Sequence, residues 1–152
     1  KDVGVEVTQE KMESIHRGQA AQQKFIAENT VDKPLVVQDT DLFSTLGYWR
    51  LWNTIEPFSL NYDARLLKSD LYIIPQSNIP FEEDPLRYGD DERESQDQFW
   101  IDICEEFELP YVVLQSSSRE GRLAEAREIC MKLVQSDIDT LNFTRFGREY
   151  EA

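Results

Sequence analysis

Three short apolar runs, separated by longer amphipathic stretches, constrain the fold of this chain more than any other feature. The runs are Leu35–Val37, Leu71–Ile74 and Tyr111–Leu114. Each is too short for a helix and almost wholly apolar, which is typical of a strand buried on both faces. Apolar strands that alternate with helices form a parallel sheet with helices on both faces. The sequence therefore predicts an α/β fold.

Amphipathic stretches around these runs supply the expected helices. They are Gln9–Asn29 with Thr8 as its N-cap, Leu42–Trp52, about Leu60–Leu67, Ser95–Phe107 and Arg119–Val134. Three strands make a thin sheet, since about five or six are usual. The chain also begins on a helix, without the strand that should precede it. We therefore expect a missing first β-α-β unit, and either a preceding segment or another chain in an oligomer that completes the sheet and covers its edges.

Charge and composition exclude several kinds of partner. The net charge of −14 argues against nucleic acid, because proteins that bind its backbone carry a basic stripe. A mononucleotide remains compatible, since a small phosphate site needs only a few arginines and backbone N–H groups. No apolar run approaches the roughly 20 residues that cross a bilayer, so no membrane partner is expected. Cys104 and Cys130 lack a disulfide framework, which predicts a cytoplasmic protein.

Two carboxylates follow the first apolar run, in the sequence Gln38-Asp39-Thr40-Asp41. Ligands of open parallel sheets bind beyond the carboxyl ends of the strands. An acidic residue at this place can hold Mg²⁺ beside nucleotide phosphates, usually through water, as in a Walker-B element. A second carboxylate two residues later could orient or deprotonate an attacking hydroxyl. The alternative is that Asp41 caps the helix that begins at Leu42.

Two arginines, Arg87 and Arg93, lie in the polar stretch between the second apolar run and the next helix. Phosphoryl transfer spreads negative charge over three oxygens, and arginines on a closing segment can stabilise that charge. The competing interpretation is that both side chains pair with nearby acidic residues. Such ion pairs on a protein surface contribute little to stability. From the sequence alone, that interpretation is favoured.

Other motifs add mostly negative information. A P-loop reads Gly-x-x-x-x-Gly-Lys-[Ser/Thr], but none of the six glycines here is followed by lysine. His16 is the only histidine, which excludes a histidine-based metal cluster. The two cysteines are more typical of packed thiols than of nucleophiles. Trp49 could stack on a base or a pyridine ring, although a core position is favoured.

Several of these segments together resemble a known family. The stretch from about Met12 to Val134 is similar to the C-terminal three-quarters of ribosylnicotinamide kinase domains, which belong to bifunctional bacterial NAD-salvage proteins, and to their AAA-related P-loop relatives. The residues that carry the resemblance are Ser14–Gln19, Leu35–Leu42, Asp70–Ile74, Ile79–Arg87, Arg93, Pro110–Val113 and Arg122. The Asp-Thr-Asp element and the Ile-Pro-aromatic…Asp-x-x-Arg segment are the most specific parts.

The resemblance implies a reaction and a role for each of these residues. The expected reaction transfers the γ-phosphate of ATP to the 5′-hydroxyl of nicotinamide riboside or a similar nucleoside. Asp39 would be the Mg²⁺-associated carboxylate, and Asp41 would orient substrate or nucleophile. Arg87 and Arg93 would lie over the ATP phosphates. Arg122 would lie near the adenine pocket. Trp49 is not among the residues that carry the resemblance and is the candidate contact to the nucleoside only because its ring could stack on a base.

The chain departs from the family in two respects. It lacks the family's first strand, P-loop, helix and second strand, and it has Pro85 where the family usually has glycine. We therefore expect residues 1–135 to be the C-terminal three-quarters of a P-loop kinase-like domain, followed by a tail over residues 136–152. The parent protein would be a kinase, and the chain alone would be inactive. Two alternatives stay open: a non-catalytic nucleotide-binding or regulatory module on a decayed kinase scaffold, and a P-loop kinase with another substrate.

Overall fold

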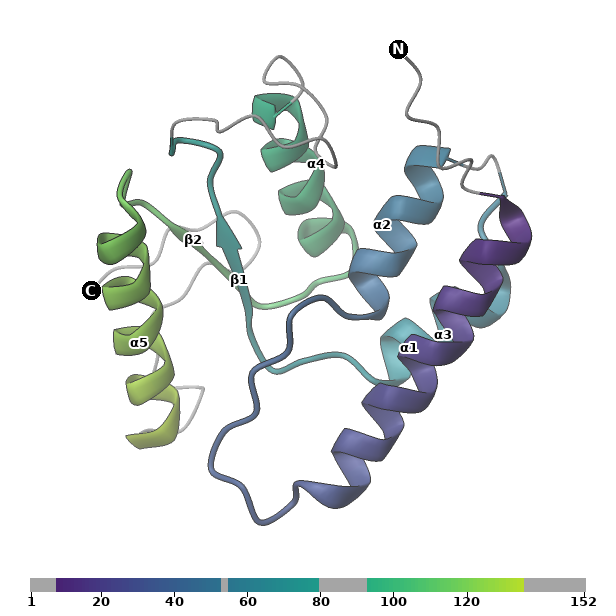
Figure 1. Ribbon diagram of the computed structural model, residues 1–152, viewed down its shortest axis with the longest axis horizontal. Coiled ribbons are helices and arrows are strands. Elements are labelled where there is room, and N and C mark those ends of the chain that lie inside the picture. Colours follow the sequence, from purple (N-terminus) through teal and green to yellow (C-terminus); the bar gives the residue numbers. More distant parts are fainter. Residues whose placement is uncertain (1–7, 53–54, 80–92, 136–152) are drawn as a thin grey trace. The chain divides into compact units, whose positions relative to one another are not determined.

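The computed structural model describes residues 8–52, 55–79 and 93–135, and it divides into two compact units. The first unit spans residues 1–68, and the second spans residues 69–152. Figure 1 shows that the described part of the first unit is helical, whereas the second contains a small sheet. Each unit is described by itself below.

The first unit packs three helices against one another: α1 (Gln9–Asn29), α2 (Leu42–Trp52) and α3 (Phe58–Leu66). Helix α1 begins where the Thr8 hydroxyl accepts a hydrogen bond from the Lys11 N–H at 3.3 Å, as the sequence predicts. Helix α3 begins after Pro57, whose carbonyl accepts from Leu60 N–H at 3.1 Å. The core between the helices contains Met12, Leu42, Phe43, Leu46, Trp49, Leu60 and Ala64.

One buried polar side chain, that of Gln23, joins all three helices. Gln23 is only 3% exposed and lies on α1. Its Oε1 accepts a hydrogen bond from the N–H of Leu42 at 2.9 Å, at the start of α2. Its Nε2 donates to the carbonyl of Leu67 at 3.2 Å, just after α3. The side-chain amide thus satisfies backbone groups at two helix ends, which are costly to leave unpaired when buried.

Replacing Gln23 by alanine is expected to lower the free energy of unfolding by about 1–3 kcal/mol, because the Leu42 N–H loses its acceptor in a buried place. Urea denaturation followed by far-UV circular dichroism measures the change. Gln22→Ala is the matched control, since Gln22 is exposed on the same helix. Equal effects of the two substitutions would show that the bridge contributes nothing.

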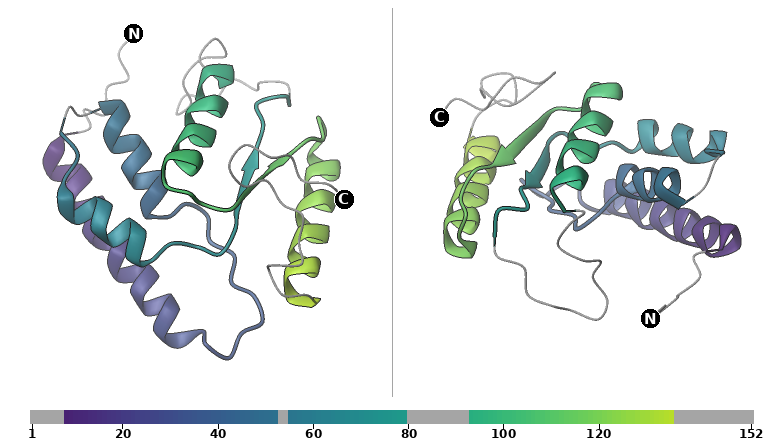
Figure 2. Two further views of the ribbon diagram at one scale, coloured as in Figure 1. Left: turned by 180° about the vertical axis from the view of Figure 1, so that it is seen from behind. Right: turned by 90° about the horizontal axis from the view of Figure 1, so that it is seen from above.

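The second unit contains two parallel strands, β1 (Tyr72–Pro75) and β2 (Tyr111–Leu114), and two helices, α4 (Arg93–Glu106) and α5 (Arg119–Gln135). Tyr72 pairs with Tyr111 and Pro75 pairs with Leu114. Helix α4 contacts β1 and helix α5 contacts β2. The two helices lie on opposite sides of the strands in the views of Figures 1 and 2.

The core of the second unit lies between the sheet and its helices. Val112 and Leu114 of β2 pack with Ile129 of α5, and this cluster also includes Leu71, Ile73, Ala126 and Leu133. Ile103, Cys104 and Phe107, from α4 and the residue that follows it, are buried as well. Alternate residues of each strand point to opposite faces, so both faces of this short sheet need cover. Both cysteines are free thiols.

The structure confirms the α/β class, the parallel pairing and most of the predicted elements, but one predicted strand is wrong. Residues 35–37 form no strand, and Val37 is 75% exposed. A strand needs a neighbouring backbone to complete its hydrogen bonds, and no described residue forms a ladder with this segment. The described sheet therefore has two strands instead of three. Residues 136–152 lie outside the described part of the chain.

In the described ranges, no helix is both long enough and apolar enough to span a bilayer.

Candidate functional site

The Asp39–Asp41 turn directly precedes α2 and has an unusual backbone. Thr40 has a φ of 64°, in the left-handed region that is a genuine outlier for a β-branched residue. The Gln19 side chain of α1 donates to the Thr40 carbonyl at 3.3 Å and helps to hold the turn. Asp39 is exposed, and among the described residues its carboxylate has no partner. The turn thus presents one unpaired carboxylate to solvent.

Asp41, the second carboxylate, caps helix α2. Its Oδ1 accepts a hydrogen bond from the Ser44 N–H at 3.0 Å, and the residue is 5% exposed. The Asp41 carbonyl accepts from the Thr45 N–H at 3.0 Å and so begins the helical pattern. The structure therefore places Asp41 in the N-cap position that the sequence offered as an alternative. Its contact with a reacting hydroxyl stays a prediction.

In the second unit, polar side chains gather where β1 and β2 end. The Arg122 Nη2 donates to the Gln76 carbonyl and to the Asn78 Oδ1, and the Arg122 Nε donates to the Ser116 carbonyl at 3.0 Å. The Asn78 Nδ2 donates to the Gln115 carbonyl at 3.2 Å. Arg122 and Asn78 therefore join the loop after β1 to the loop after β2, at the edge where parallel sheets bind their ligands.

Each of these loops is also fastened to a helix by a carboxylate. Asp97 of α4 accepts from both the N–H and the hydroxyl of Ser77, each at 2.7 Å. Glu125 of α5 accepts from the Gln115 N–H at 3.0 Å and from the Ser116 N–H at 3.1 Å. Hydrogen bonds from backbone N–H groups to carboxylates are among the stronger ones in proteins. The two loops at the carboxyl edge of this sheet are thus fixed to α4 and α5 by side-chain hydrogen bonds.

Gly121 lets the loop after β2 pass close to the first turn of α5. A Cβ at this position would lie 2.0 Å from the Ser116 Oγ and 2.8 Å from the Ser116 Cβ. We expect Gly121→Ala to lower the free energy of unfolding by about 1–3 kcal/mol, since the loop must move. Gly18→Ala is the control within a helix, because a Cβ there meets nothing within 4 Å, and it should raise stability by about 0.5–1 kcal/mol. Thermal denaturation of both variants measures the difference, and equal shifts would contradict the close approach.

The remaining predicted site residues have mixed outcomes. Trp49 is 1% exposed, and its indole N–H donates to the Ile55 carbonyl at 2.8 Å, which is the packing expected of a core residue. Its contact with a nucleoside stays a prediction. Arg93 is the first residue of α4, and Arg87 lies outside the described residues. The roles of both arginines stay predictions.

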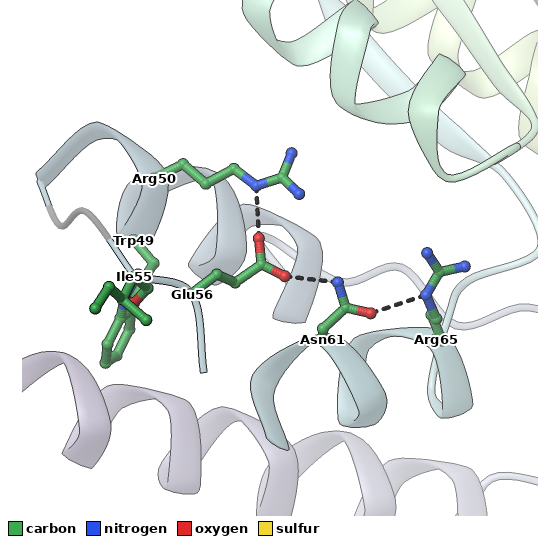
Figure 3. Close-up of polar contacts among 6 residues, drawn as sticks. All are labelled: Trp49, Arg50, Ile55, Glu56, Asn61 and Arg65. Atoms are coloured by element: carbon green, nitrogen blue, oxygen red, sulfur yellow. Dashed lines mark hydrogen bonds and ion pairs between the residues drawn. The ribbon is translucent and has the colours of Figure 1, made fainter. Parts of the chain in front are cut away.

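Sequence reasoning missed two polar clusters in the first unit. Figure 3 shows a chain of contacts in which the Arg50 Nε donates to Glu56 at 2.7 Å, Asn61 donates to Glu56 at 2.6 Å, and the Arg65 Nε donates to Asn61 at 2.8 Å. In the second cluster, His16 lies 2.8 Å from Asp63. Only the four-residue spacing of Asn61 and Arg65 was a readable signal.

The structure first defines the class of the protein. Parallel strands connected through a helix define an α/β domain, and the polar loops lie at the edge of the sheet where such domains bind their ligands. The chain belongs to the AAA domain family, which it matches over residues 3–122. This is a family of P-loop-type nucleotide-binding domains. A comparison with curated proteins gives no match.

Proposed function

We propose that the full-length gene product transfers the γ-phosphate of ATP, with Mg²⁺, to the 5′-hydroxyl of nicotinamide riboside or a similar small nucleoside. The observation that carries the proposal is the unpaired, exposed carboxylate of Asp39 on a left-handed turn, within a chain of the AAA domain family. Backbone outliers of this kind cluster at functional sites. The resemblance to ribosylnicotinamide kinase domains supplies the class of acceptor.

The residues around Asp39 fit a magnesium ion of the kind that accompanies ATP. Mg²⁺ in nucleotide sites keeps several waters and takes one or two carboxylates together with phosphate oxygens. Among the described residues, no group of three or more His, Cys, Asp or Glu side chains forms a dedicated metal cage. A single carboxylate that is open to solvent, such as that of Asp39, is compatible with this kind of site and so supports the proposal.

The chain's own residues then have separate tasks. Asp39 would hold the ion, and Asp41 caps α2 directly after the turn. When bound, Mg²⁺ neutralises charge on the transferred phosphoryl group. Arg87 and Arg93 are proposed to stabilise the same charge from the segment that precedes and begins α4. Trp49 is part of the buried core of the first unit, and its contact with the nucleoside stays a proposal.

The test is a turnover assay on the full-length gene product with Mg-ATP and a panel of nucleosides. We expect Mg²⁺-dependent ADP release that saturates with nicotinamide riboside and a matching nucleoside phosphate in the mass spectrum. Turnover with a different acceptor alone would favour another P-loop kinase. ATP binding without turnover of any acceptor would contradict the proposal and favour a non-catalytic nucleotide-binding module.

A further inference from the structure

Arg122 makes more contacts between separate segments than any other single side chain described above. Its guanidinium donates to three acceptors in two loops: the carbonyls of Gln76 and Ser116 and the side-chain oxygen of Asn78. The loop residues it joins are about 40 positions apart in the chain, and both loops follow strands of the same sheet. Asn78 adds a second link through its bond to the Gln115 carbonyl.

These contacts bear on how Arg122 would act in the proposed reaction. A guanidinium that binds phosphate directs its N–H groups at the ligand in a bidentate arrangement. Here the Nε and Nη2 groups are instead directed at backbone and amide oxygens of the protein. Both carbonyl acceptors lie within two residues of a strand end and are half-buried, and a backbone acceptor that is shielded from water is costly to leave unpaired.

We infer that Arg122 is a positioning residue, which holds the loops after β1 and β2 in register at the carboxyl edge of the sheet and does not itself bind the phosphates of ATP. The effect of this positioning on catalysis rests on the proposed function. The two loops are held together by the branched shape of the guanidinium, which reaches acceptors in both, more than by its positive charge. This distinguishes the inference from a role for Arg122 as a ligand of the nucleotide.

A conservative substitution distinguishes a role in positioning the loops from a role in binding phosphate. Lysine keeps the positive charge but has a single ammonium group on a flexible stem, so it cannot reproduce a fork that reaches three acceptors. If Arg122 positions the loops, Arg122→Lys should behave like Arg122→Ala. If it binds phosphate as a charge, lysine should restore most of the activity. Arg127→Ala is the matched control, because Arg127 is exposed on the same helix.

The first readout is amide hydrogen exchange on the full-length protein, which needs no turnover. The amides to follow are those of Ser77, Gln115 and Ser116, which bond to Asp97 and Glu125. We expect exchange at these amides to rise about tenfold or more in both Arg122 variants, with no change in Arg127→Ala. Asn78→Ala removes the Asn78 contacts with Arg122 and with the Gln115 carbonyl but leaves both bonds from Arg122 to backbone carbonyls. It should give a smaller rise at the same amides, which keeps the test valid if Arg122→Ala folds poorly. Unchanged exchange would overturn the inference.

The second readout is the kinetics of the reaction. Both Arg122→Lys and Arg122→Ala should lower kcat/KM for ATP by about 10- to 100-fold, as expected when a site's supporting contacts are lost. Recovery to within about threefold of the unaltered enzyme by lysine would overturn the positioning role. If the unaltered protein shows no turnover, the proposed function fails, whereas the exchange result still decides whether Arg122 fastens the loops.

Discussion

Replacement of Asp39 by asparagine is expected to lower the rate of phosphoryl transfer by about a hundredfold or more, a loss of the size seen when one charge-stabilising group is removed from an active site. Asparagine is neutral and nearly isosteric, so it removes the negative charge that would hold the hydrated Mg²⁺ ion. The side chain of Asp39 is exposed and unpaired among the described residues, so the fold should not change. Steady-state turnover with saturating Mg-ATP measures the effect.

Asp32→Asn is the control for this prediction. Asp32 is also an exposed carboxylate of the first unit, and it pairs with neighbouring Lys33 at 3.3 Å. A surface pair of that kind has little effect on stability, so turnover should stay within about twofold. Unchanged turnover in Asp39→Asn would remove Asp39 from the proposed metal site.

Replacement of Trp49 by alanine is expected to lower the free energy of unfolding by about 3–5 kcal/mol, as for other large aromatic side chains in protein cores. Trp49 is 1% exposed and lies on α2, the helix that contacts both α1 and α3. The substitution also leaves the Ile55 carbonyl without the indole donor. Urea denaturation followed by the helical signal at 222 nm, a standard far-UV wavelength, measures the loss.

Phe58→Ala separates this core role from a general effect of losing an aromatic ring. Phe58 is 85% exposed and stacks on Tyr62 at a centroid separation of 6.3 Å. Its removal should change stability by about 0.5 kcal/mol or less. If Trp49→Ala left stability unchanged but weakened nucleoside binding, the stacking interpretation of Trp49 would replace the core one.

Most helices could be predicted because their signals are local. Thr8 caps α1 and Asp41 caps α2, and both helices begin and end at the predicted residues. Helix α3 begins two residues earlier than predicted, because Pro57 supplies its first acceptor. Strand β2 also has its predicted ends. In each case the side chains that decide the boundary lie within a few positions of it.

Features that depend on distant residues could not be predicted. An apolar run such as 35–37 favours a strand, but only a partner backbone makes it one. The Arg122 contact with Gln76 joins residues 46 positions apart, and the contact of His16 with Asp63 joins residues 47 apart. No spacing rule connects such pairs. The sequence therefore indicated Arg122 as a site residue but not the protein acceptors that it reaches.

The proposed kinase activity is tested most directly by phosphorus NMR of the product that the full-length gene product forms from Mg-ATP and nicotinamide riboside. We predict a new phosphate monoester resonance, coupled to the 5′-methylene protons of the ribose, that appears only when Mg²⁺ is present. ATP that binds but gives no phosphorylated nucleoside, with this acceptor or any other, would contradict it.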